Sequence, residues 1–173
     1  MEIVESQVSD CEDICFDYIS EKERASFYDL NLRYSMIIFI YSGGLRIDHK
    51  GRRTLLKKGE YVFIKQEAAA DICIQRGSKE DFCGVYIGLS KPFLNAFYYD
   101  YCKTKISYCT PRFEKEVIKL DYTPYIQSIY ISIIPYLRYN RKPSDSLIRI
   151  KQLESIYSLL LYDERFYYCL FEL

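Results

Sequence analysis

The sequence has no long apolar run and no positively charged start, and both absences exclude classes of protein. A helix that crosses a membrane needs about 20 consecutive apolar residues, whereas the longest apolar run, 36–41, has only the length of a strand. A secretory signal opens with basic residues before an apolar stretch, but residues 1–18 are acidic and lack this pattern. We therefore expect a cytoplasmic protein without a membrane segment.

An excess of positive charge is also missing. Lys and Arg total 24 and Asp and Glu total 24, so the formal net charge is zero. Affinity for DNA depends largely on basic residues that neutralise phosphates. A chain with no net positive charge and no helix-turn-helix pattern is therefore a poor candidate for recognising DNA by itself.

Histidine is scarce, since His49 is the only one in the chain. It lies in a charged turn, where we expect a solvated side chain. A Ser-His-Asp set would have to be built around it, and neither a G-x-S-x-G motif nor a glycine-rich phosphate loop occurs. The carboxylates lie mostly in charged, turn-like contexts that do not suggest an acid-base pair. We therefore expect no catalytic residue and no enzymatic activity.

The seven cysteines are an odd number with little paired spacing; they stand at positions 11, 15, 73, 83, 102, 109 and 169. A cytosolic protein keeps its thiols reduced, and most then pack as small apolar residues. The C-x3-C spacing of Cys11 and Cys15 leaves a redox switch or a metal site open. Their acidic neighbours raise rather than lower the pKa of a thiol, so incidental cysteines are the favoured interpretation.

The chain has the length and composition of one soluble domain, with 173 residues of which 49% are hydrophobic and 28% charged. Before residue 90, short runs of β-branched and aromatic residues end at turn signals, and Gly43-Gly44 predicts a tight reversal. The predicted strands are 34–42, 45–48, 53–56, 60–65, 70–76 and 82–89. Their even spacing is typical of an antiparallel sandwich or a small barrel.

After residue 90 the pattern becomes helical. Ser90 is a candidate N-cap with Pro92 just inside a helix that runs through 94–102. A second helix is predicted over 122–137, where Pro135 indicates a kink or a nearby end. A third covers 145–161, and a short aromatic segment, 165–171, follows. The chain is thus expected to be an α+β protein.

Several segments, in this order, resemble the cupin-like sensor domain of AraC-type transcription regulators. They are YSGGLRI and LLKKGEYVFIKQ within residues 34–90, then GVYIGLSKPFLNAF, then IPYLRYNRKPSDSLIRIKQLESIYSLLLYDERFYYCLF. The resemblance covers roughly residues 25–172, and the order resembles the subgroup of type III secretion activators. It implies a cupin-like barrel or sandwich at 1–90 and a helical dimerisation subdomain at 91–173, in one compact unit.

The resemblance also implies what lies outside the chain. Family members normally continue with two helix-turn-helix units, so DNA would be contacted only through that absent C-terminal domain. The chain is then either a sensor domain taken from a longer regulator, which is the favoured interpretation, or a natural fragment. Cupin enzymes hold a metal with two or three histidines and a carboxylate, and one histidine cannot build such a site. We therefore expect no metal and no cofactor.

The 19 tyrosines are the most unusual feature of the composition. Tyrosine has a large apolar body and one polar tip, which suits both core edges and ligand pockets. Packing in the core and at interfaces is the favoured interpretation. The alternative, tied to the cupin-like resemblance, is a pocket for a small ligand. Its predicted lining is Tyr41, Tyr61, Phe63, Ile74 and Tyr86.

The predicted helix at 145–161 carries an apolar stripe that must be covered by its own sheet, a neighbouring helix or a second subunit. In the family that the chain resembles, helices of this region can form the dimer contact. The candidate interface residues are Leu147, Ile150, Leu153, Glu154 and Tyr157. Packing within one subunit, against the 122–137 helix, is an equally weighted alternative.

The leading hypothesis is thus a homodimeric regulatory module that senses an effector and acts on a DNA-binding domain. The effector is either a small molecule in the barrel or a regulatory protein, and an interior crowded with Ile, Phe and Tyr favours the protein. A free-standing module that dimerises and binds a regulatory protein is the alternative. An enzyme on a cupin scaffold is disfavoured because a single histidine leaves little for a catalytic cluster.

Overall fold

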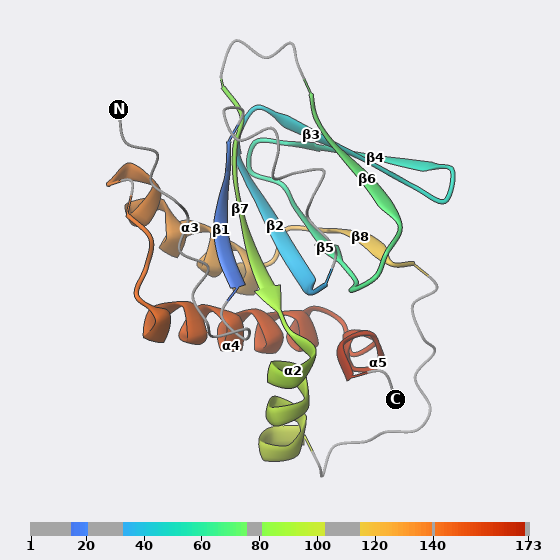
Figure 1. The fold of residues 1–173 in the computed structure, drawn as a ribbon, viewed down its shortest axis with the longest axis vertical. Coiled ribbons are helices and arrows are strands. Elements are labelled where there is room, and N and C mark those ends of the chain that lie inside the picture. The colour runs from blue at the N-terminus through green and yellow to red at the C-terminus, as the bar shows by residue number, and fades with distance from the viewer. Residues whose placement is uncertain (1–14, 21–32, 76–80, 103–114, 140, 172–173) are drawn as a thin grey trace.

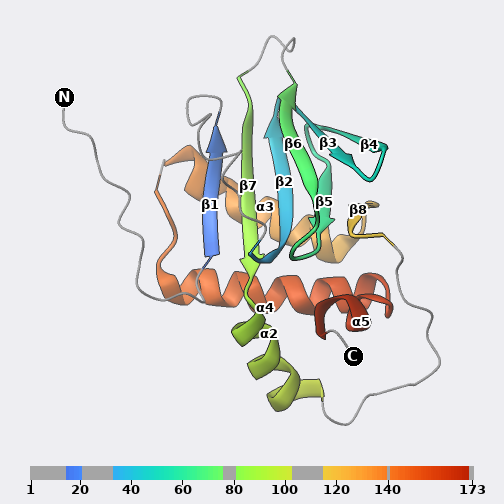
Figure 2. The same cartoon turned by 45° about the vertical axis from the view of Figure 1, so that its right-hand side comes forward.

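The computed structural model of the protein describes residues 15–20, 33–75, 81–102, 115–139 and 141–171. They form three layers: a three-stranded sheet, a five-stranded sheet and a set of helices (Figure 1). Turning the molecule by 45° shows the helices on one face of the larger sheet (Figure 2). The predicted α+β fold, an antiparallel sandwich with helices after it, is confirmed. The two sheets are separate and do not close into one barrel.

The larger sheet is antiparallel in the order β1-β7-β2-β5-β8. Its strands are β1 (Cys15–Ser20), β7 (Cys83–Leu89), β2 (Ser35–Ser42), β5 (Tyr61–Ile64) and β8 (Val117–Leu120). The central strand β2 is apolar on both faces because one face packs on the helices and the other on the smaller sheet. Sequence analysis predicted β2, β5 and β7, but not the two edge strands β1 and β8.

The smaller sheet has the order β4-β3-β6, with β4 (Arg52–Lys57), β3 (Gly44–His49) and β6 (Ala70–Gln75). The turn between β3 and β4 has positive φ at Lys50 (48°) and Gly51 (75°), as a tight hairpin requires. The hairpin expected at Gly43-Gly44 is wrong, because β2 and β3 lie in different sheets. Gly43 has φ 71°, and a Cβ there would lie 3.0 Å from Phe82 Cα, so this crossover needs glycine.

The larger sheet separates two apolar clusters by the alternation of its side chains. Between the sheets lie Met36, Ile38, Ile40, Leu45, Ile47, Leu56, Val62, Ile64, Ala68, Ile72, Phe82 and Val117. On the opposite face, Ile37, Phe39, Tyr61, Phe63, Val85 and Ile87 pack under the helices. The second cluster includes residues of each α-helix that the structure describes, so these helices complete a core that the sheet begins.

The helices are α2 (Lys91–Phe97), the π-helix η2 (Tyr98–Cys102), α3 (Pro124–Arg138), α4 (Asp145–Tyr162) and α5 (Phe166–Phe171). The predicted cap of α2 is confirmed, since Phe93 N donates to Ser90 Oγ over 3.2 Å. Thr123 caps α3 in the same way. Pro135 lies inside α3, which ends three residues later at Arg138.

The sheet and the helices on the two sides of the predicted boundary at residue 90 are interlocked. Strand β8, at 117–120, follows the first helices in the sequence but pairs with β5 in the larger sheet. The helices and the sheet also share one apolar cluster. The boundary between a barrel at 1–90 and a helical part at 91–173 stays a prediction. Among the described residues, no helix is both long and apolar enough to cross a membrane.

Candidate functional site

The five residues predicted to line a pocket lie on two sides of the larger sheet. Tyr41, Tyr61 and Phe63 face the helices, whereas Ile74 and Tyr86 pack against the cluster between the sheets. The first three thus share a face with one another but not with the other two. Sequence analysis could not detect this separation, because strand alternation gives two faces without saying which one meets which layer.

Tyr41 and Tyr61 belong to an aromatic group around Tyr130 of α3. The Tyr41 and Tyr130 rings stack with centroids 4.4 Å apart, and the Tyr41 hydroxyl donates to Tyr130 O over 2.7 Å. The Tyr61 hydroxyl donates to Gln127 Oε1 over 3.4 Å. Burial raises the pKa of both Tyr61 and Tyr130, which keeps the phenols neutral. These contacts fix α3 on the sheet and favour the packing interpretation, while ligand binding stays a prediction.

The space between the two sheets is filled by side chains. Met36, Ile38, Ile40, Leu45 and Ile47 have no exposed surface there. Protein interiors of this kind are close-packed and leave little room for a bound molecule. The crowding expected from the sequence is therefore found in the described residues.

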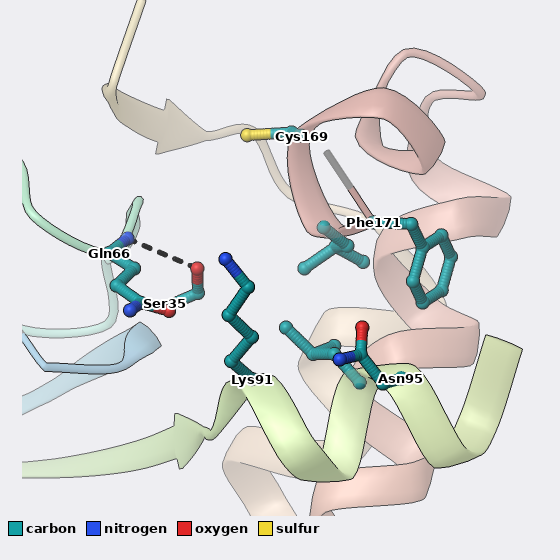
Figure 3. A pocket seen from close by; sticks show the side chains of 8 residues that line it. Ser35, Gln66, Lys91, Asn95, Cys169 and Phe171 are labelled. Atoms are coloured by element: carbon teal, nitrogen blue, oxygen red, sulfur yellow. Dashed lines mark hydrogen bonds between the residues drawn. The ribbon is translucent and has the colours of Figure 1, made fainter. Parts of the chain in front are cut away.

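A small pocket lies where the end of the larger sheet meets α2 and α5 (Figure 3). It is lined by Ser35, Gln66, Lys91, Leu94, Asn95, Cys169, Leu170 and Phe171, and about 20 Å³ is open to water-sized molecules. Figure 3 shows the Lys91 side chain directed into it, beside Ser35, whose Oγ accepts from Gln66 N over 3.1 Å. A space of this size holds about one water molecule, so beside the Lys91 ammonium and the Ser35 hydroxyl it admits at most the acidic tip of a larger molecule.

Sequence analysis missed this pocket. One local signal was available, because Lys91 and Asn95 are four residues apart and so lie on the same side of α2. The other polar lining residues come from the start of β2, the turn after β5 and α5. Only the tertiary structure brings segments so distant in the sequence together.

The predicted interface residues lie on α4, and most are exposed. Leu147, Ile150 and Tyr157 are 37%, 54% and 46% exposed, and Leu161, one turn beyond, is 62% exposed. Leu153 is partly buried against the helical core. Glu154 is also partly buried, since it accepts from Ser128 Oγ over 3.1 Å and from Lys151 Nζ over 2.7 Å. Most of the apolar stripe predicted on α4 is therefore exposed and does not pack against the sheet.

A different side of α4 packs on the sheet. Its buried residues are Ile148, Gln152, Ser155, Ile156, Ser158 and Leu159. Gln152 is fully buried and donates from Nε2 to Gly88 O of β7 over 2.8 Å. Two small serines in this contact are compatible with close approach of the helix to the strand. The buried side is thus partly polar, which is why apolar periodicity alone did not identify it.

The exposed apolar side of α4 lies next to the end of the segment formed by α2 and η2. The Tyr157 ring lies 5.2 Å from that of Phe97 and 6.4 Å from that of Tyr101, centroid to centroid. Phe97 is buried, whereas Tyr101 is exposed. The exposed apolar surface therefore extends from α4 to η2, where aromatic side chains of the two helices are in contact.

His49 is not the solvated turn residue that the sequence indicated. Its side chain is 10% exposed, with Nε2 3.0 Å from Glu116 Oε2 and Nδ1 2.8 Å from Ala69 O. The hydrogen bond from Lys50 holds the pKa of Glu116 below its usual value. The His49 side chain is largely covered because the β3–β4 turn folds against the segment that leads into β8, so its contacts link the two sheets.

Among the described residues, no group of three or more His, Cys, Asp and Glu could hold a metal ion. Cys73, Cys83 and Cys169 do not form disulfides, and burial raises the pKa of Cys83. Cys11 and Cys109 lie outside the described residues, as do the side chains of Cys15 and Cys102. The C-x3-C interpretation therefore stays a prediction.

Solved structures of ToxT are similar in fold to this chain. An apo ToxT variant from Vibrio cholerae has a TM-score of 0.53 and 15% identity, over 92% of this chain and 56% of that chain. Wild-type ToxT with bound unsaturated fatty acid has a TM-score of 0.52 and 12% identity, over 73% and 44%. EutQ from Clostridium difficile has a TM-score of only 0.30 and 17% identity, over 45% and 50%. The chain spans about half the length of these solved chains.

At such low identity, the likeness to ToxT shows a shared fold. No curated protein sequence matches the chain. A family model described as the ExsA N-terminal regulatory domain, however, matches residues 35–167, which include β2 to β8, α2, α3 and α4. The match extends over most of the chain and agrees with the resemblance found in the sequence. The chain therefore belongs to the family of ExsA N-terminal regulatory domains.

Proposed function

We propose that this regulatory domain forms a homodimer through the exposed face of α4. The observation that carries the proposal is the set of large apolar side chains left uncovered on that helix, namely Leu147, Ile150, Tyr157 and Leu161. Contiguous exposed apolar surface is characteristic of interaction sites. The domain would act in the cytoplasm, without cofactor or catalysis, and leave sequence-specific recognition of DNA to a separate domain.

The spacing of these residues favours a second copy of the chain as the partner. Leu147 and Leu161 stand the same number of residues before and after Glu154. The midpoint of Ile150 and Tyr157 falls between Leu153 and Glu154, so the two apolar pairs have nearly the same centre along the helix. In an antiparallel pair with its two-fold axis near this centre, each apolar residue meets an apolar residue of the partner subunit. A two-fold interface must be complementary to itself in this way.

The charged residues at the centre are compatible with that arrangement. Glu154 is neutralised within its own subunit by Lys151, whose Nζ also donates to Ser132 Oγ of α3 over 2.7 Å. An axis near Glu154 therefore does not place two uncompensated carboxylates together. From Leu147 to Leu161 the stripe is about 21 Å long at 1.5 Å rise per residue, and Tyr101 extends it.

Sedimentation equilibrium of the chain tests this proposal. We expect a reversible dimer, and substitution of Ile150→Glu with Tyr157→Glu should raise its dissociation constant by about 100-fold or more, because buried hot-spot residues each contribute about 2 kcal/mol. Leu55→Glu is the matched control, since Leu55 is 45% exposed but lies on β4. A chain that stays monomeric at high concentration, or a control that dissociates equally, would contradict the proposed interface.

We further propose that the signal is a regulatory protein, because side chains fill the interior of the sandwich. The pocket at Lys91 supports a second candidate, a small acidic molecule, and ToxT, which shares the fold, has been solved with bound unsaturated fatty acid. Thermal-shift measurements with short and long carboxylic acids distinguish the two. A stabilisation that disappears in Lys91→Gln but persists in Lys115→Gln would favour the small molecule; no stabilisation would favour the protein.

A further inference from the structure

The neutral total charge conceals a strongly uneven distribution. Residues 44–65 contain seven Lys and Arg but only two Asp and Glu, and residues 115–120 contain two Lys and one Glu. Together these segments carry six positive charges in excess, in a chain whose formal net charge is zero. We call this region, residues 44–65 and 115–120 with β3, β4, β5 and β8, the basic edge.

Side-chain contacts join the two segments at one side of the sandwich. Lys119 of β8 donates to Leu55 O of β4 over 3.2 Å and lies 2.7 Å from Glu60 Oε1. Lys50 of the β3–β4 turn lies 3.0 Å from Glu116 Oε2, just before β8. The hairpin and β8 lie on the same side in both views (Figures 1 and 2). The cations therefore form one surface that spans both sheets.

The carboxylates of the basic edge are already engaged by cations within it. Asp48 lies 2.8 Å from Arg46 Nε and 2.9 Å from Arg53 Nε. The hydrogen bond from Arg53 lowers the pKa of Asp48. Glu60 pairs with Lys119, and Glu116 with Lys50. Even with these pairs, the cations outnumber the carboxylates three to one. On the β6 side the surface ends at Asp71, which stands opposite Asp48 in the register.

The excess charge is accessible. Lys50 and Arg53 stay 64% and 63% exposed although they pair with Glu116 and Asp48. Beyond these ion pairs, Arg52, Lys57 and Lys58 are also exposed. Arg52 begins β4 and Lys58 directly follows its last residue, so the two are about 20 Å apart at 3.3 Å per residue. That distance matches several successive phosphates of one DNA strand, which advance about 3.4 Å per base pair along the helix axis.

The same surface lacks the apolar residues that a protein interface needs. Leu55 is the one large apolar side chain exposed among residues 44–65 and 115–120. Protein partners bind mainly through central aromatic and aliphatic residues, whereas contacts to a phosphodiester backbone need little beyond clustered cations. We propose that the basic edge binds the phosphate backbone of duplex DNA without reading its sequence, as an auxiliary contact of the regulatory domain.

Fluorescence anisotropy of the 173-residue chain with a short labelled DNA duplex tests this proposal. We expect weak binding at low salt that does not depend on the sequence of the duplex. The triple variant Arg52→Gln, Lys57→Gln, Lys58→Gln should bind at least about tenfold more weakly. The slope of log affinity against log salt should become shallower by about 0.9 for each lost phosphate contact.

The matched control removes three exposed cations at the end of α3 and after it, Arg138→Gln, Arg141→Gln and Lys142→Gln. It changes the net charge by the same amount and should leave most of the affinity intact. Three results would overturn the proposal: no binding at low salt, an equal loss in the control, or tighter binding of single-stranded RNA or poly-glutamate than of the duplex. Thermal melting of both variants checks that they remain folded.

Discussion

The helical side of the molecule and the basic edge carry opposite kinds of surface. Of the large apolar side chains exposed in the described residues, all but Leu55 lie on η2, α3, α4 or the residues that flank α3. The basic edge instead presents exposed Lys and Arg. Apolar burial depends weakly on salt, whereas contacts to phosphate are screened by it. One small domain can therefore offer two contact surfaces whose binding affinities respond differently to ionic strength.

The largest expected effect concerns the core that joins the sheet to the helices. Phe63 is fully buried, and its ring meets that of Phe166 of α5 edge to face at 5.1 Å. Phe63→Ala should lower the free energy of unfolding by about 3–5 kcal/mol. Leu56→Ala, between the sheets, should cost about 2–5 kcal/mol.

Urea denaturation followed by both tyrosine fluorescence and circular dichroism measures these losses. Because β8 pairs with β5 and the helices share the core of the sheet, we expect one coincident transition in which either substitution destabilises the whole chain. Two separate transitions, each affected by only one substitution, would instead support independent units divided near residue 90.

The second-largest effect is expected from salt, which should weaken DNA binding by the basic edge much more than dimerisation through α4. With three phosphate contacts, raising salt from about 50 mM to about 200 mM predicts a drop of about 40-fold in affinity for duplex DNA. The same change should alter dimerisation by less than about threefold, since the α4 face is mainly apolar. Anisotropy and sedimentation at matched salt concentrations measure both. A dimer as sensitive to salt as the DNA complex would remove the distinction between the surfaces.

A smaller effect tests how α4 is oriented. Gln152→Leu removes the hydrogen bond to Gly88 O within a buried contact, which should cost about 1–3 kcal/mol of unfolding free energy. Ile150→Leu, on the exposed face, should cost less than about 0.5 kcal/mol. Chemical denaturation of both variants gives the comparison. An equal cost at both positions would mean that the exposed and buried sides of the helix are assigned incorrectly.

The smallest effect is expected from acid. Asp48, Glu116 and Asp163 have pKa values lowered by hydrogen bonds from Arg53, Lys50 and Arg165 respectively. Such carboxylates contribute stability that is fully present above their ordinary values of 3.8 and 4.5 and is lost as the pH falls through the lowered values. Unfolding free energy should therefore change little from about pH 7 to pH 5 and decrease below about pH 4.

Glu116→Gln distinguishes this cause from general acid unfolding. The amide keeps the shape of the side chain but loses the ion pair with Lys50, so part of the acid-dependent loss should disappear. Asp81→Asn, at an exposed position after the smaller sheet, serves as the control. If Glu116→Gln retained the full decrease below pH 4, the contact between the hairpin and β8 would contribute nothing to acid stability.

Local sequence patterns predicted the type and approximate limits of most elements. Apolar runs closed by glycine turns located six strands, and the Ser90 cap and the apolar periodicity located α2, α3 and α4. These signals are local, because caps, turns and side-chain periodicity depend on neighbouring residues. The order of the segments was also enough to identify the family that the match over 35–167 shows.

How these elements combine depends on contacts that only the folded chain makes. The tertiary structure placed β2 and β3 in different sheets, put β8 at an edge and covered most of the His49 side chain. It turned the Gln152 side of α4 toward the sheet, leaving Ile150 and Tyr157 exposed, and it joined separate basic segments into one edge. Pairing partners, helix rotation and charge clustering depend on contacts between residues far apart in the chain, so local patterns cannot specify them.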